Sequence, residues 1–378
     1  MSETPLLSDL IETAQAPTSR RSFITRASAM LAIPGVGAAL TACSAPDPTP
    51  GAGYSGPPKQ GQMVHKGSMN SNSRLDTALV GEQHASSITG AVSTDVSQAA
   101  FRVFDPTLPP APANGRLELH WRAQHKTIRI SPDTVVAGWT FEGDIPGPIV
   151  HCRVGDTVEF TLTNDVDVPH SMDFHAAQID PKTAFKSVAK GESVRFTFQP
   201  KWAGAFMYHC GTAPVLMHIG SGMYGAIIVS PREPLPQAKE FVLVQSEFYL
   251  ANETGGIRAF DYQKMLATMP DFVAFNGRPN QYIEHPIKVK VGDRVRFWVM
   301  NAGPTHPCNF HVVGEQFDTM YLGSPPASAI RGVQTWAVAP GGGMVFELMC
   351  DVAGEFPFVN HGFGHGQKGS IGFLVVEP

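Results

Sequence analysis

Charged residues are scarce in this sequence: Asp, Glu, Lys and Arg make up only 16% of its 378 residues, and the net charge is −5. Because there is no basic surplus to bind a polyanion, we expect no nucleic-acid partner. Helix breakers are plentiful instead, with 37 glycines and 32 prolines, a composition typical of many short strands joined by tight turns. The composition therefore predicts an all-β fold class.

The N-terminus has the order of an export signal. Arg20 and Arg21 precede the apolar run 27–40, which is followed by Leu-Thr-Ala-Cys ending at Cys43. The run is shorter than the roughly 20 residues that a membrane-spanning helix needs. Paired arginines in this place resemble the twin-arginine signal, and the last four residues resemble a lipobox. We expect residues 1–43 to direct export, to the periplasm or elsewhere outside the cytoplasmic membrane, with either lipidation of Cys43 or plain cleavage near it.

The sequence has few cysteines. An odd number of them remains after setting aside Cys43, in the export signal, and Cys210, which is considered below as a metal ligand. Of the five in the sequence, Cys152, Cys308 and Cys350 are left, so at most one intramolecular disulfide can form among them. We expect these three thiols to pack in strand cores as small apolar side chains.

The composition and residue pattern of the chain change after residue 115. Residues 44–115 are rich in Ser, Thr, Ala, Gly and Pro and predict a tether and a partly ordered arm. Beyond them, residues 142–165 are echoed by 276–303, each with an extended segment, a Val-Gly-Asp turn and an alternating segment ending in Asn. Such a repeat predicts two β-sandwich domains in tandem, 116–232 and 240–378, with one short helix near residues 262–268.

A set of soft metal ligands lies in the first repeat. Cys210, His218 and Met223 have the spacing C-x7-H-x4-M, and His170 lies on an earlier segment of the same repeat. Two histidines and a cysteine with a weak axial methionine form the blue-copper type of electron-transfer site. The alternative is that the sulfur-containing side chains only fill the core.

His209 belongs to a different site. Successive side chains of a strand point to opposite faces, and the neighbouring Cys210 is already a ligand of the predicted blue-copper site. His175 has an odd offset from the first histidine of the blue site, so it also faces away. We expect a third histidine from the second repeat, His361, with His365 as the rival. Three histidines leave an open position on a metal, which is the catalytic arrangement.

Together these motifs resemble the copper-containing nitrite reductases, a family of two-domain cupredoxins that reduce nitrite to nitric oxide; the resemblance covers Leu117 to Pro378. It implies two cupredoxin-like Greek-key sandwiches and two coppers per chain, as well as a homotrimer in which a neighbouring subunit donates one type 2 ligand. The implied ligands are His170, Cys210, His218 and Met223 for type 1 copper, and His175, His209 and His361, the donated one, for type 2 copper.

The resemblance also implies two proton-handling residues, Asp173 and His311, with Val313 over the substrate. Reduction of nitrite consumes one electron and two protons, so acids beside the open copper fit the chemistry. The electron would come from a small cytochrome or blue-copper protein and pass through the His209–Cys210 pair. The plainer interpretations are that Asp173 only orients a ligand histidine and that His311 is an ordinary strand histidine.

Two other functions use the same ligands. A two-domain multicopper oxidase of laccase type needs a trinuclear copper cluster held largely by His-x-His pairs, and the sequence contains no such pair. A non-enzymatic electron carrier or copper-binding protein would show the blue chromophore without turnover, which only an activity measurement distinguishes.

Overall fold

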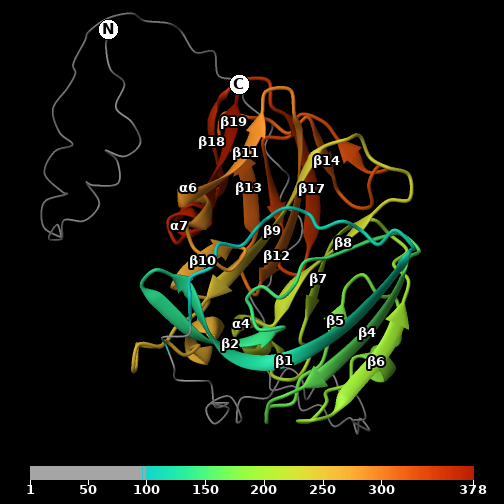
Figure 1. Ribbon diagram of the computed structural model, residues 1–378. Helices are drawn as coiled ribbons and strands as arrows, with labels where there is room; N and C mark the ends of the chain where they lie inside the picture. Colours follow the sequence, from blue (N-terminus) through green and yellow to red (C-terminus); the bar gives the residue numbers. More distant parts are fainter. Residues whose placement is uncertain (1–95, 97–98) are drawn as a thin grey trace, which may run out of the picture. The chain divides into compact units, whose positions relative to one another are not determined.

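The computed structural model describes Val96 and residues 99–378 (Figure 1). The predicted export signal, Cys43 and most of the predicted arm lie outside these described residues. Within them, none of the helices has the length and apolar character needed to cross a membrane.

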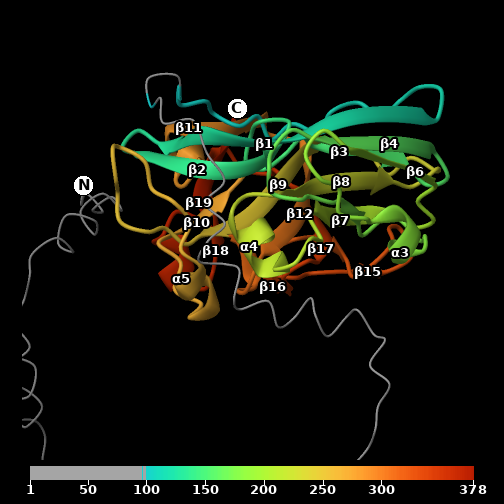
Figure 2. The ribbon, with the colours of Figure 1, turned by 90° about the horizontal axis from the view of Figure 1, so that it is seen from below.

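The first half of the described chain forms two four-stranded sheets, in the orders β2-β1-β4-β6 and β3-β8-β7-β5 (Figures 1 and 2). Side chains of β4 and β6 alternate between buried and more exposed, so each strand turns one face to an aromatic core that includes Trp121 and Phe160. The strands are β1 (Arg116–Ser131), β2 (Thr134–Phe141), β3 (Val150–Arg153), β4 (Thr157–Asn164), β5 (Asp173–Phe174), β6 (Ser193–Phe198), β7 (Gly204–His209) and β8 (Tyr224–Ser230).

The second half repeats this plan with a six-stranded sheet, β10-β9-β12-β17-β14-β15, and a five-stranded sheet, β11-β19-β18-β13-β16. The prediction of an all-β chain with two sandwiches is confirmed. The strands are β9 (Lys239–Phe248), β10 (Phe272–Phe275), β11 (His285–Lys290), β12 (Arg294–Gly303), β13 (Cys308–Val312), β14 (Thr319–Tyr321), β15 (Ala329–Ile330), β16 (Thr335–Val338), β17 (Gly343–Met349), β18 (Gly354–Asn360) and β19 (Ile371–Glu377).

Helices are short throughout the described residues. The predicted helix near 262–268 is α5, capped by Asp261, whose carboxylate accepts hydrogen bonds from the backbone N–H groups of Gln263 and Lys264. The expectation of a single helix is wrong, because the described part of the chain contains four others, each too short to show a helical period in the sequence. The helices are α3 (Pro181–Ala184), α4 (Val215–Gly220), α5 (Tyr262–Leu266), α6 (Gln281–Glu284) and α7 (Phe363–Gly366).

The two sandwiches share a packed boundary, where β7 of the first meets β12 and β17 of the second. The backbones approach closely here: a Cβ on Gly343 would lie 2.0 Å from the carbonyl oxygen of Ala205, so only glycine fits. The end of the predicted arm contacts both sandwiches. The Leu108 N–H donates to the backbone carbonyl of Glu240 in the second sandwich, and the Arg153 side chain of the first sandwich donates to the carbonyl of Pro112. This packing places the end of β7 close to the second sandwich.

Cys152, Cys308 and Cys350 are buried free thiols, as expected from the sequence. Burial raises the pKa of Cys152 and of Cys350 to about 12 and that of Cys308 further still. These three thiols stay protonated at neutral pH and act as core side chains.

A buried charge cluster lies in the second sandwich. Arg296, only 2% exposed, donates from Nε to Glu347, itself 2% exposed, at 2.6 Å, and from Nη1 to Glu240 at 2.6 Å. Glu240 also accepts a hydrogen bond from Trp298 Nε1 at 2.8 Å. Each charge in this cluster depends on its partner, because an unpaired buried charge is costly.

Replacing Glu347 by Gln should lower the free energy of unfolding by about 3 kcal/mol, since Arg296 then keeps only Glu240 as a charged partner. Breaking the exposed Lys190–Asp167 pair with Asp167→Asn should change it by less than about 1 kcal/mol. Denaturant unfolding of both variants checks this, and equal effects would contradict the buried role of Glu347.

Candidate metal centres

The C-terminal end of β7 is tied to the segment that follows it. Cys210, directly after β7, donates its N–H to the carbonyl of Met223 at 3.1 Å, and Met223 N–H donates to the carbonyl of His218 at 3.1 Å. His218 lies on α4, so a short helix presents this ligand. The three residues are thereby held in one closed turn between β7 and β8.

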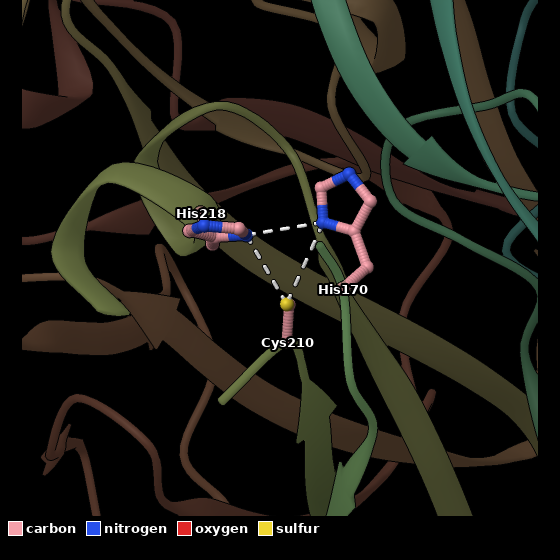
Figure 3. Close-up of side chains that lie close together, drawn as sticks. All are labelled: His170, Cys210 and His218. Atoms are coloured by element: carbon pink, nitrogen blue, oxygen red, sulfur yellow. Dashed lines mark hydrogen bonds between the residues drawn. The ribbon is translucent and has the colours of Figure 1, made fainter. Parts of the chain in front are cut away.

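Three donor atoms converge in a buried cluster, His170, Cys210 and His218, which we call the cysteine cluster (Figure 3). Cys210 Sγ lies 3.2 Å from His218 Nδ1 and 3.8 Å from His170 Nδ1, and the two Nδ1 atoms are 3.1 Å apart. Two imidazole nitrogens and one thiolate facing a common point are the donor set that copper prefers. The residues present therefore fit a type 1 copper.

The Cys210 thiol is poised to ionise. Burial alone would raise its pKa, but the charges and hydrogen bonds of His218 and His170 outweigh burial and hold the pKa well below the ordinary value. Because the thiolate is the form that binds metal, the cluster favours coordination before any ion arrives.

Ser171 holds the sulfur from the other side. Its backbone N–H donates to Cys210 Sγ at 3.4 Å, and its buried hydroxyl accepts hydrogen bonds from Gly211 N–H at 3.0 Å and Thr212 Oγ1 at 3.1 Å. Hydrogen bonding around the cysteine sulfur tunes the redox potential of blue-copper sites. Adjacency to His170 was the only sequence signal that could have found it.

His125 of β1 also touches the cysteine cluster and was missed by sequence analysis. Its Nε2 lies 3.2 Å from Nε2 of His170, and its ring stacks on Trp139 with centroids 4.9 Å apart. Burial lowers the pKa of His125 to about 3, so the imidazole is neutral. No spacing in the sequence relates His125 to His170, because they lie on distant segments that only tertiary packing brings together.

A second cluster, Asp173, His175 and His209, lies on the opposite side of β7 and is partly exposed; we call it the histidine cluster. The Nε2 atoms of His175 and His209 are 3.1 Å apart, and Asp173 Oδ2 lies 3.8 Å from His209 Nε2. Burial and the neighbouring His209 lower the pKa of His175, which favours the neutral ligand form.

Backbone carbonyls orient both imidazoles of the histidine cluster. His209 Nδ1 lies 3.0 Å from the carbonyl of Cys210, and His175 Nδ1 lies 3.1 Å from that of Gly341, in the second sandwich. Each Nδ1–H donates to its carbonyl, so each Nε2 is left unprotonated to face a metal. The sequence argument for His175 assumed a regular strand, but β5 has only two residues; His175 is instead held by its N–H donating to Met207.

The remaining candidates form a separate group on the second sandwich. His361 and Val313 are exposed, and the ring of His361 lies 5.3 Å from that of His311, whose Nδ1 donates to the carbonyl of Gln334 at 2.6 Å. Within the described residues, neither histidine joins the histidine cluster. His365, the rival, packs instead on the ring of His306.

Comparison with known proteins relates the chain to copper enzymes. Residues 122–234 match the family model described as multicopper oxidase. A copper-containing nitrite reductase of Neisseria meningitidis serogroup A is 38% identical over 285 residues, covering 72% of this chain and 73% of that protein.

Solved structures give the same result. A copper nitrite reductase from Nitrosomonas europaea has a TM-score of 0.65 and 34% identity, covering 69% of this chain and 94% of that one. A copper-containing nitrite reductase from Thermus scotoductus has a TM-score of 0.64 and 30% identity, covering 69% and 62%. The predicted pair of tandem cupredoxin-like sandwiches is confirmed by these neighbours.

Proposed function

The chain belongs to the copper-containing nitrite reductases and is a copper-dependent oxidoreductase of that family, and from this premise we propose how its residues divide the work of reducing nitrite to nitric oxide. Each chain contributes ligands to two coppers. Type 1 copper is held by His170, Cys210, His218 and Met223, and type 2 copper by His175, His209 and His361.

The observation that carries the proposal is the direction of two adjacent side chains. Cys210 points into the buried cysteine cluster, whereas His209 points into the histidine cluster. When bound, the coppers supply one-electron transfer and an open position for nitrite. The peptide unit between these residues, reinforced by the contact of His209 Nδ1 with the Cys210 carbonyl, is the connection along which we propose the electron moves.

Asp173 and His311 are proposed to handle the two protons. The Asp173 carboxylate lies beside His209 and is partly exposed, so it can take a proton from solvent and hold it at the site. His311 uses Nδ1 to bind the Gln334 carbonyl, which leaves Nε2 as the atom that gives or takes a proton.

The separation of His361 from the histidine cluster supports a homotrimer. Two histidines hold a metal weakly, and a third is needed for a catalytic site. His361 is exposed on the second sandwich together with His311, so a neighbouring copy can bring both to the histidine cluster. We propose that each active site lies between two subunits.

Export and electron supply complete the proposal. The twin-arginine-like segment, with Cys43 as lipid attachment site, supports a location outside the cytoplasmic membrane. A small cytochrome or blue-copper protein in that compartment is the proposed donor. A laccase-type reaction is disfavoured because the sequence lacks His-x-His pairs, and a simple electron carrier would have no use for the His311–His361 pair.

The paired measurement of copper spectra and turnover on one sample tests this function. Copper-loaded protein should show both type 1 and type 2 signals in electron paramagnetic resonance and should release nitric oxide from nitrite with an artificial reductant. A single copper type, or a fully loaded sample that forms no nitric oxide, would refute the proposal.

The proton-handling roles predict variants that separate colour from turnover. His311→Ala and Asp173→Asn should each lower kcat by about 10²- to 10⁴-fold, the range for loss of a general acid. The blue absorption should stay unchanged, because neither residue contacts the cysteine cluster. Loss of colour in either variant would show that the assignment is wrong.

The shared active site predicts complementation between inactive subunits. His175→Ala and His361→Ala homo-oligomers should both be inactive, but co-assembly from an equal mixture should restore roughly a quarter of wild-type activity, because one in four interfaces then pairs two intact halves. If both ligands acted within one chain, no mixture would recover activity.

A further inference from the structure

The β1–β2 hairpin places an aromatic pair against the cysteine cluster. His125 of β1 and Trp139 of β2 are direct cross-strand partners, and their rings stack at 4.9 Å with an interplanar angle of 8°. Trp139 is itself fixed, since its N–H donates to the carbonyl of Ser221 at 3.0 Å, directly after α4. The hairpin is therefore tied to the turn that carries His218.

This pair touches both histidines of the cysteine cluster. His125 Nε2 lies 3.2 Å from Nε2 of His170, and the Trp139 ring meets the His218 ring edge-on at 4.9 Å. His170 turns its Nδ1 toward Cys210, so the proton of its neutral imidazole is on Nε2, facing His125. Only an acceptor can occupy the His125 position favourably.

We propose that His125 is a positioning residue of the type 1 copper site, whose Nε2 accepts the Nε2–H of His170 and holds the His170 Nδ1 toward the metal. The inference rests on the proposed ligand set. It assigns no contact with the metal or with nitrite to His125, which acts only through His170.

One buried donor stays unpaired in this arrangement. If Nε2 of His125 is the acceptor, its proton is on Nδ1, which is buried with no hydrogen-bond partner among the described residues. An unpaired buried donor is unfavourable, because the group has lost its hydrogen bond to water. An apolar side chain stacked on Trp139 would only transfer the unpaired donor to the Nε2–H of the buried His170.

The expected effect follows from ligand basicity. A hydrogen bond from the rear N–H of a ligating histidine makes its metal-binding nitrogen a better electron donor, which favours the oxidised metal. Loss of such a partner typically weakens metal binding by 10-fold or more. If oxidised copper alone loses about 10-fold in affinity, the one-electron reduction potential rises by about 59 mV.

Two substitutions separate the hydrogen bond from the stacking. His125→Phe keeps a ring on Trp139 but has no acceptor, whereas His125→Gln keeps an acceptor near the Nε2 position but has no ring. His120→Phe, at an exposed position of the same strand, is the matched control. The type 1 potential is measured by redox titration of the blue band in copper-loaded protein, alongside copper dissociation and the type 1 hyperfine splitting.

We expect H125F to raise the potential and weaken copper binding about 10-fold, and H125Q and H120F to stay near wild type. Equal shifts in H125F and H125Q, or none in either, would overturn the proposal. Thermal unfolding of the copper-free variants is measured first, to establish that each one folds. If H125F does not fold, His125→Leu is used in its place. Wild-type protein without a blue band would instead refute the underlying ligand assignment.

Discussion

The structure depends on the alternation of side chains at the end of one strand. At the end of β7, His209 and Cys210 are neighbours in the chain, yet their side chains lie on opposite sides of the backbone and belong to different clusters. Any shift of β7 by one residue would exchange the two faces and destroy both sites at once. The position of β7 between β5 and β8, and its close contact with β17 at Gly343, fixes that register.

The two clusters differ in the environment that their chemistry requires. His170, Cys210 and His218 are fully buried, which suits a site that exchanges only electrons and must not admit solvent. The histidine cluster is partly exposed and contains a carboxylate, which suits a site that takes up nitrite and protons. One strand thus serves a dry site on one side and an accessible site on the other.

The histidines are oriented by the atoms behind them. Backbone carbonyls hold His175 and His209 so that Nε2 is the metal-facing atom, whereas an imidazole lies behind His170, whose metal-facing atom is Nδ1. A carbonyl is a fixed part of the backbone, but a side-chain acceptor can be replaced during evolution. The potential of the proposed type 1 site would therefore be adjustable through His125 without any change in the ligands.

The sequence alone determined what depends on neighbours along the chain: the C-x7-H-x4-M spacing, the opposite directions of His209 and Cys210, the duplicated sandwich and the helix at α5. Each of these follows from strand alternation, a turn or a repeat, which local residue order encodes.

Only the tertiary structure decided the contacts between distant segments. Tertiary packing brings His125 to His170, boundary packing brings the Gly341 carbonyl to His175, and within one chain the fold keeps His361 away from the histidine cluster. Such contacts depend on how strands pair and pack, and no spacing in a single sequence records that.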